Sequence, residues 1–308
     1  MSESAEQRSL CREPATAIPE RYVLVTAAHN EASHIQGTID SVVNQTLLPE
    51  RWVIVSDSST DATDDIIKES ARRYPFIQYV RLDRNSSASS ADFASKVFAV
   101  AHGYRLLKNL PFQYIGNLDA DVSFGEDYFA SLLGEFRTRP GLGIGGGIIT
   151  ERGATGILVR PHNGLSHVSG AAQFFRRACW EAIGGYLPVA AGGEDTIAIV
   201  MARMKGWQVV VFPQLTIQHH KLGNHVRGAL RESFRDGAKD YALGSHPVFQ
   251  LLKSLSHLWQ RPYLLDALVR TFGFFWQYCK QTKRQVDPDF VRYFRSEQWD
   301  KLKSRCLR

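Results

Sequence analysis

The sequence lacks the features of a secreted, disulfide-linked or membrane-spanning protein. Its 308 residues include only four cysteines, and no two of them form a Cys-x-x-Cys pair. Neither a disulfide framework nor a zinc site is therefore expected, and a reducing compartment is indicated. Residues 1–20 are polar and mixed in charge, which argues against a signal peptide. We expect a cytoplasmic protein.

Several sequence motifs are also missing. The glycine run 141–147 follows no first strand and opens no helix, so it does not predict a dinucleotide-binding loop and is read instead as a flexible strand or a strand edge. No zinc-finger or RNP motif is present in the basic C-terminal region, and we therefore expect no nucleic-acid partner. The sequence contains no internal repeat and no low-complexity segment.

Strands alternate with helices through the first 130 residues. Short apolar runs predict strands, and periodic apolar positions predict the helices between them. The expected strands are 21–27, 51–56, 76–82 and 112–118, and the expected helices are 33–43, 61–73 and 91–107. This alternation predicts an α/β fold with a mostly parallel sheet.

Beyond residue 130 the pattern changes. We expect strands near 141–147, before 175, at 208–212 and at 215–218, with helices at 176–183 and 192–205. From residue 226 onward the pattern is helical to the end of the chain. We divide the chain into a polar tail (1–19), a catalytic domain (20–222) and a helical C-terminal region (223–308).

Asp119 and Asp121 follow the fourth predicted strand and form an Asp-x-Asp pair. Ligands of parallel sheets bind beyond the carboxyl ends of the strands, and Asp57 ends the second strand in the same way. We expect these carboxylates to converge on one crevice. Carboxylate oxygens suit Mg²⁺ or Mn²⁺.

Four motifs occur in order along the chain: Ala27-Ala-His-Asn-Glu31, Ser56-Asp-Ser-Ser-Thr-Asp61, Asp119-Ala-Asp121 and Gly193-Glu-Asp195. Over roughly residues 20–245 the chain thereby resembles the family 2 inverting glycosyltransferases. The resemblance implies the A-type glycosyltransferase fold, a Rossmann-like sheet flanked by helices. The chain departs from the family pattern at Ser56, where an acid is usual, at Ser58, where glycine is usual, and in having no proline at the end of the first strand.

The resemblance implies a site for a nucleotide-diphospho-sugar, with UDP as the expected nucleotide. Its expected contacts are Ala27, His29, Glu31, Asp57, Asp92, Lys96 and Asp119. Asp121, with Asp119 beside it, would hold a divalent cation that stabilises the diphosphate leaving group. His219 and His220 are either packing or surface histidines or contribute one further metal ligand, and strand alternation allows only one of the two to face the metal.

For catalysis, the resemblance assigns Asp195 as the base that deprotonates the acceptor hydroxyl, with Glu194 as its neighbour. A helix N-terminus lowers a carboxylate pKa and a second carboxylate raises it. Processive synthases of the family carry a Gln-x-x-Arg-Trp motif, which residues 221–241 lack. Transfer of a single sugar to a polysaccharide or lipid-linked acceptor is therefore expected. The alternatives are a sugar-nucleotide nucleotidyltransferase and a non-catalytic sugar-nucleotide or lipid-binding protein.

The C-terminal region is basic and aromatic. Residues 221–308 contain 17 Lys and Arg against 8 Asp and Glu, whereas the rest of the chain has 20 against 23. Between residues 247 and 280 the longest stretch without a charge is 271–279, well below the about 20 residues of a membrane span. Residues 247–308 therefore predict either an interfacial helix on an anionic cytoplasmic membrane surface or a cap that packs on the domain or on a second subunit.

Overall fold

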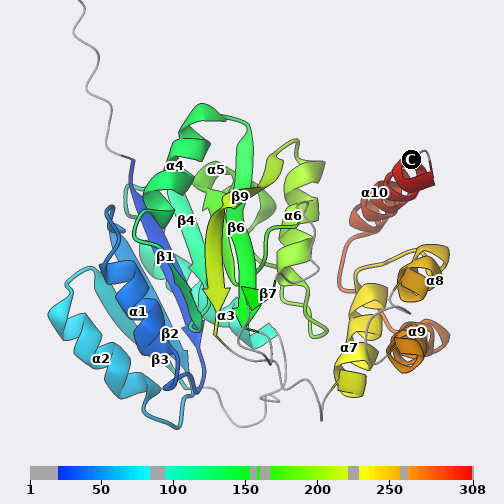
Figure 1. Ribbon diagram of the computed structural model, residues 1–308, viewed down its shortest axis with the longest axis horizontal. Helices are drawn as coiled ribbons and strands as arrows, with labels where there is room; N and C mark the ends of the chain where they lie inside the picture. The colour runs from blue at the N-terminus through cyan, green and yellow to red at the C-terminus, as the bar shows by residue number, and fades with distance from the viewer. Residues whose placement is uncertain are drawn as a thin grey trace, which may run out of the picture.

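The structure is a computed structural model that contains one mixed β-sheet with helices on both faces (Figure 1). The residues that it describes are 20–83, 94–152, 158–159, 167–220, 229–256 and 263–306. Within them the sheet has the order β3-β2-β1-β4-β8-β6-β9-β5, with β7 paired to β6.

The first half of the sheet confirms the predicted alternation. Strands β1 (Tyr22–Ala28), β2 (Arg51–Asp57), β3 (Ile77–Leu82) and β4 (Tyr114–Leu118) are all parallel. They are separated by α1 (Ile35–Val43), α2 (Thr63–Arg73) and α3 (Ala94–Leu107). Alternate residues of β1 face opposite sides: Leu24 packs in one apolar cluster and Val23 and Val25 in the other. Such two-sided burial is expected of a parallel strand between helix layers.

The second half of the sheet is mixed rather than parallel. After β5 (Val122–Phe124) and α4 (Tyr128–Thr138), the chain forms β6 (Leu142–Arg152), β7 (Leu158–Val159) and β8 (Ala172–Arg176). It continues through α5 (Arg177–Ile183), α6 (Glu194–Met204) and β9 (Gln208–His219). β8 is antiparallel to both β4 and β6, while β6 and β9 are parallel. The predicted parallel pairing therefore holds for the first four strands and for β6 with β9, while β5, β7 and β8 pair antiparallel with their neighbours.

The glycine run lies in β6, between two other strands, so the predicted strand is confirmed and the alternative of a strand edge is wrong. β6 has β8 on one side and β9 on the other. A Cβ at Gly145 would come within 2.8 Å of the Phe136 ring, and one at Gly147 would clash with the backbone oxygen of Leu215. The glycines are thus explained by close packing on an interior strand.

Residues 208–219 form one strand, where the sequence predicts two. The register between β6 and β9 shifts between Gly147 and Ile148, whose partners are Phe212 and Thr216. Pro213 falls in this shift, and a proline has no N–H to donate to the ladder. The interruption in the sequence pattern is therefore a bulge within a continuous strand.

Two apolar clusters hold the helices on the sheet. Residues of α1, α2 and α4 pack on one face, and residues of α3, α5 and α6 pack on the other. This three-layer arrangement presents the carboxyl ends of β1, β2 and β4 at one edge, where ligands bind in α/β sheets.

The C-terminal region is helical, as predicted, and lies beside α6 (Figure 1). It contains α7 (Ala229–Ala242), α8 (Pro247–Ser256), α9 (Tyr263–Cys279) and α10 (Pro288–Cys306). Leu243, Val286 and Phe290 share a buried cluster with Ile197 and Val200 of α6. Among the residues described, no helix combines the length and the apolarity that a membrane crossing requires.

Candidate active site

The turns after β1 and β2 are bonded to each other. The Asn30 side-chain oxygen accepts a hydrogen bond from the Thr60 backbone N–H (2.8 Å), and the Glu31 N–H donates to the Thr63 hydroxyl (2.8 Å). Asn30 and Ser58 both have positive φ, at 54° and 56°. Glycine tolerates this conformation best. The positive φ therefore accounts for the glycine that is usual in the family at position 58, where this chain has serine.

Asp57 and His29 meet where these turns converge. Asp57 is 4% exposed, and its backbone oxygen accepts a hydrogen bond of 2.6 Å from His29 Nδ1. Because a carbonyl oxygen can only accept, the proton of the neutral ring lies on Nδ1. The fold thus brings together the nucleotide contacts predicted on the first two strands, with Ala27 partly buried at the end of β1.

Lys96 links the Asp-x-Asp pair to the start of α6. Its Nζ lies 2.6 Å from Asp119 Oδ1 and 3.8 Å from Glu194 Oε1, and it donates to the Gly170 backbone oxygen at 3.3 Å. Burial favours the neutral amine, but the charges of Asp119 and Glu194 outweigh it and raise the pKa of Lys96 above its usual range. The Lys96 ammonium group therefore contacts carboxylates from two of the four motifs, the Asp-x-Asp pair and Gly193-Glu-Asp195.

Asp121 pairs with His219 on the neighbouring strand β9. Asp121 Oδ2 lies 3.2 Å from His219 Nε2, and His219 Nδ1 lies 3.2 Å from Glu151 Oε1. The hydrogen bond with Asp121 is the main cause that raises the pKa of His219 to about 9. The next ring, His220, instead lies 2.7 Å from the Ser123 hydroxyl. Of the two histidines, His219 is the one that faces the Asp-x-Asp pair.

The donor set around Asp121 fits a divalent cation in part. A carboxylate oxygen and an imidazole nitrogen within 3.2 Å are suitable ligands for Mn²⁺, and the metal would replace the proton now shared by the pair. In the described part of the chain no three His, Cys, Asp or Glu side chains gather into a metal site. The remaining ligands would have to come from the phosphates of a bound nucleotide, as is usual for Mg²⁺.

Asp195 is held on both carboxylate oxygens. Its Oδ2 accepts from His167 Nε2 (3.1 Å) and from the Gly170 N–H (3.2 Å), and its Oδ1 accepts from the Thr196 N–H (2.6 Å). Burial acts to raise the pKa of Asp195. The hydrogen bond and charge of His167, the Thr196 N–H and the charge of Lys96 overcome it and hold the pKa below its usual value.

His167 and Glu151 are the site residues that the sequence did not predict. His167 lies outside every regular element and outside the four motifs, so no pattern marked it. Glu151 could have been found only from the pairing of β6 with β9, in which it is the partner of His219. Asp92, the remaining predicted contact, lies outside the described residues.

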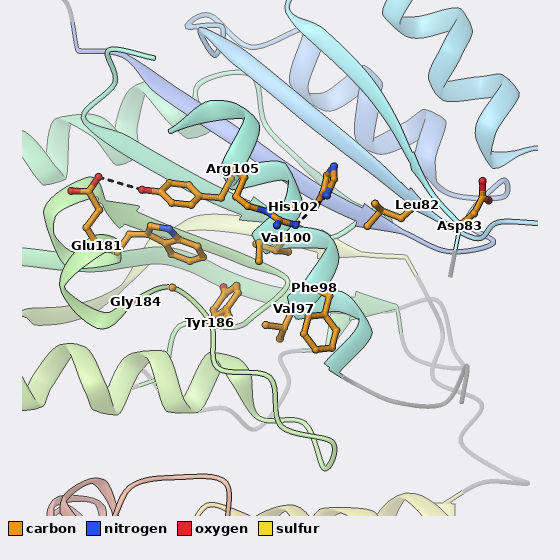
Figure 2. Close-up of a pocket in the computed structure, with 14 residues that line it drawn as sticks. Leu82, Asp83, Val97, Phe98, Val100, His102, Arg105, Glu181, Gly184 and Tyr186 are labelled. Carbon is orange, nitrogen blue, oxygen red and sulfur yellow. Dashed lines mark hydrogen bonds between the residues drawn. The ribbon is translucent and has the colours of Figure 1, made fainter. Parts of the chain in front are cut away.

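A separate cavity of about 700 Å³ lies against α3. Figure 2 shows its lining, which includes Phe98 and His102 of α3, Glu181 of α5 and Tyr186. None of the predicted site residues lines it. The carboxylate cluster, and not this cavity, is therefore the candidate active site.

Comparison with known proteins gives the family. Residues 23–185, slightly more than half of the chain, match Glycosyl transferase family 2. The chain is 28% identical over 132 residues to a poly-beta-1,6-N-acetyl-D-glucosamine synthase from Staphylococcus epidermidis, covering 43% of this chain and 29% of the synthase. The alignment thus spans less than a third of that relative.

Two solved structures share the fold. The mannosyltransferase PcManGT from Pyrobaculum calidifontis, in complex with GDP-Man and Mn²⁺, has a TM-score of 0.55 at 14% identity and covers 92% of this chain and 82% of its own. S. aureus TarS 1-349 in complex with UDP-GlcNAc has a TM-score of 0.53 at 13% identity and covers 89% and 79%. These likenesses confirm the predicted A-type glycosyltransferase fold, and the family match confirms the predicted enzyme class.

Proposed function

The chain belongs to Glycosyl transferase family 2, and we propose that it transfers a single sugar from a UDP-sugar to a hydroxyl of a polysaccharide or lipid-linked acceptor. The reaction would invert the anomeric carbon and depend on a divalent cation. The observation that carries this proposal is the convergence of Asp119, Lys96, Glu194 and Asp195 beside the Asp121–His219 pair.

On the donor side, the turns after β1 and β2 would hold the nucleoside through Asp57 and His29. Asp121 and His219 would hold the cation, which when bound stabilises negative charge on the departing diphosphate. Lys96 would keep the Asp119 carboxylate oriented by its 2.6 Å contact and offset part of the negative charge that the cluster concentrates.

On the acceptor side, Asp195 would take the proton. The acceptor oxygen forms a bond to the anomeric carbon as the bond to the diphosphate breaks, and the hydroxyl proton passes to Asp195. Each carboxylate oxygen can accept about two hydrogen bonds, and those of Asp195 are taken: Oδ2 accepts from His167 and the Gly170 N–H, and Oδ1 from the N–H and hydroxyl of Thr196. The acceptor hydroxyl would therefore displace a donor, and His167 and the Thr196 hydroxyl are the two side-chain donors that can move.

Binding of UDP tests the donor side. In calorimetry, we expect UDP to bind in the presence of Mn²⁺ and to lose that metal-dependent binding in Asp121→Ala. The matched control is Asp127→Ala, which removes an exposed carboxylate from the turn between β5 and α4 and should bind normally. UDP binding that is equal with and without metal in the parent protein would overturn the metal site.

The sugar is identified by a separate experiment. A panel of nucleotide-sugars is incubated with the protein and Mn²⁺, and slow release of the free nucleotide is measured. We expect one or a few sugars to be hydrolysed, and we expect Asp195→Asn to stop this release. Release from no member of the panel, despite UDP binding, would favour the non-catalytic alternative.

A further inference from the structure

The outward faces of α8 and α9 are apolar. Each of their large apolar side chains there is between 43% and 62% exposed. On α8 they are Val248, Leu251, Leu252 and Leu255, and on α9 they are Leu265, Leu268, Phe272 and Trp276. Residues three or four apart share one face of a helix, so each helix presents a continuous apolar stripe. We call these eight residues the α8–α9 stripe.

The inward face of α8 is polar, and that of α9 buries a cation beside the apolar Ala267 and Phe274. Gln250 and Ser254 of α8 are 0% and 4% exposed. The Asp240 carboxylate of α7 accepts hydrogen bonds from Lys253 of α8 at 2.9 Å and from Arg270 of α9 at 3.1 Å. Burial opposes ionisation of Asp240, but these two cations outweigh it and keep its pKa below the usual value. The two helices therefore bury charged groups together with Phe274 and expose leucines, whereas a helix of a water-soluble bundle turns its charged side chains to the solvent.

The orientation of α9 is fixed by its contact with α7. A Cβ at Gly237 would clash with the backbone oxygen of Arg270, and a Cβ at Gly273 would clash with that of Phe234. The two backbones thus touch at reciprocal glycines, and the pairing of Arg270 with Asp240 sets which side of α9 faces inward. Rotation of the stripe into the protein would break both contacts.

The charges near the stripe are positive. Among the described residues, the outward faces of α8 and α9 carry no carboxylate: the single acid of the two helices, Asp266, is bonded to Ser233 of α7. Lys280 and Lys283 are exposed just after α9, and Lys280 Nζ lies 4.6 Å from the centre of the Trp276 ring. The stripe therefore ends in an aromatic ring beside Lys280, and Lys283 follows three residues later.

We propose that the α8–α9 stripe docks on the surface of an anionic membrane. Its leucine and phenylalanine side chains enter the boundary of the acyl chains, Trp276 lies at the interface, and Lys280 and Lys283 contact lipid phosphates. A second copy of the chain is a poorer partner, because two such faces would bring cations together with no carboxylate on either helix face to offset them. The inference is independent of the proposed transfer reaction.

Vesicle flotation of the full chain tests the proposal. We expect the protein to float with vesicles of phosphatidylcholine and phosphatidylglycerol, and to float weakly with phosphatidylcholine alone. The double variant Leu268→Ser, Phe272→Ser should lose binding by at least about tenfold, given the free energy of burying such side chains. Its control, Leu48→Ser with Leu106→Ser, removes side chains of similar exposure (46% and 44%) on the sheet domain and should bind like the parent.

A second variant separates the charge from the apolar contribution. Lys280→Gln with Lys283→Gln should lower binding to the anionic vesicles by about fivefold per lysine and leave the weak binding to phosphatidylcholine unchanged. Two results would overturn the proposal: equal flotation of the parent and the Leu268→Ser, Phe272→Ser variant, or a dimer in solution, measured by light scattering, that this same variant converts to a monomer.

Discussion

The sheet and the C-terminal helices of this protein are built on opposite plans. Around the sheet, aliphatic and aromatic side chains fill both clusters between the layers, and the carboxylates collect at the strand ends. In α7, α8 and α9, an ion network is buried and leucines point outward. In the first region apolar side chains pack on each other inside the fold, whereas in the second, within the described part of the chain, an apolar face is about half exposed.

The difference also appears in how each region uses its ion pairs. Lys96 and Asp119 are a quarter exposed and lie where a ligand can reach them. Asp240 is 6% exposed in its side chain and has Arg270, at 10%, as a partner. A buried pair seldom adds net stability over an apolar pair, but breaking it is costly. We therefore expect the first set of charges to matter for chemistry and the second for the shape of the helical region.

The largest expected effect is on the chemistry of the sheet region. Asp195→Asn should lower sugar transfer about 10³-fold, because a positioned base contributes about 10²–10⁴-fold, while UDP binding stays unchanged. The rate of nucleotide release and calorimetry with UDP measure the two quantities. Asp127→Asn, an exposed change of the same kind, should leave both unchanged. Full turnover in Asp195→Asn would remove this residue as the base.

A change in the ion network of the helices should affect stability instead. Asp240→Asn leaves Lys253 and Arg270 without their shared anion, and we expect a loss of about 3–5 kcal/mol in the free energy of unfolding. Urea denaturation measures it. Asp236→Asn, which removes a carboxylate that is 40% exposed, should cost less than about 1 kcal/mol. Equal losses in the two variants would contradict the distinction between buried and exposed partners.

The same network predicts a pH dependence. The pKa of Asp240 is lowered in the folded protein, so its contribution to stability is present above its unfolded pKa of about 3.9 and is lost as the pH falls through the lower folded value. Thermal unfolding below pH 4 should therefore weaken the parent protein more steeply than Asp240→Asn. Parallel pH profiles for the two proteins would show that Asp240 is not the group responsible.

The contact between α7 and α9 should be sensitive to a single methyl group. Gly237→Ala places a Cβ against the backbone oxygen of Arg270, and overpacking of this kind costs about 1–3 kcal/mol. Gly134→Ala in α4 is the matched control, since nothing lies within 4 Å of its added Cβ and alanine favours a helix by about 1 kcal/mol. The first variant should unfold at lower urea and the second at equal or higher urea.

The sequence predicted the first half of the sheet, β1 to β4, better than the second half. Alternation of apolar runs with helices located β1 to β4 and the strand-end carboxylates, because parallel strands in βαβ units follow each other along the chain. The interior position of β6 was missed, because a glycine-rich strand looks like a strand edge until Phe136 and Leu215 are seen to pack on it. The pairing of β6 with β9 joins residues about 70 apart, and no local pattern contains it.

In the C-terminal region the sequence predicted helices and one apolar face, but not which side faced inward. The sequence left open whether residues 247–308 lie on a membrane or pack as a cap, and it did not show that Lys253 and Arg270 turn toward Asp240. A long cationic side chain can serve either environment, so spacing alone could not decide. His167 was missed for a related reason: it reaches Asp195 across 28 residues of chain and belongs to no motif.

The smallest expected effect in the sheet region concerns His167, a site residue that lies outside all predicted motifs. Its hydrogen bond and charge lower the pKa of Asp195 against the effect of burial. Replacing it with Gln keeps a donor without the charge, so the pKa of Asp195 should rise. The acid limb of the pH profile of kcat/KM should then move upward by about one pH unit, as expected for the loss of one close charge partner. His102→Gln, a change in a histidine that lines the separate cavity against α3 (Figure 2), should leave the profile in place. An unchanged acid limb in His167→Gln would mean that His167 contributes packing alone.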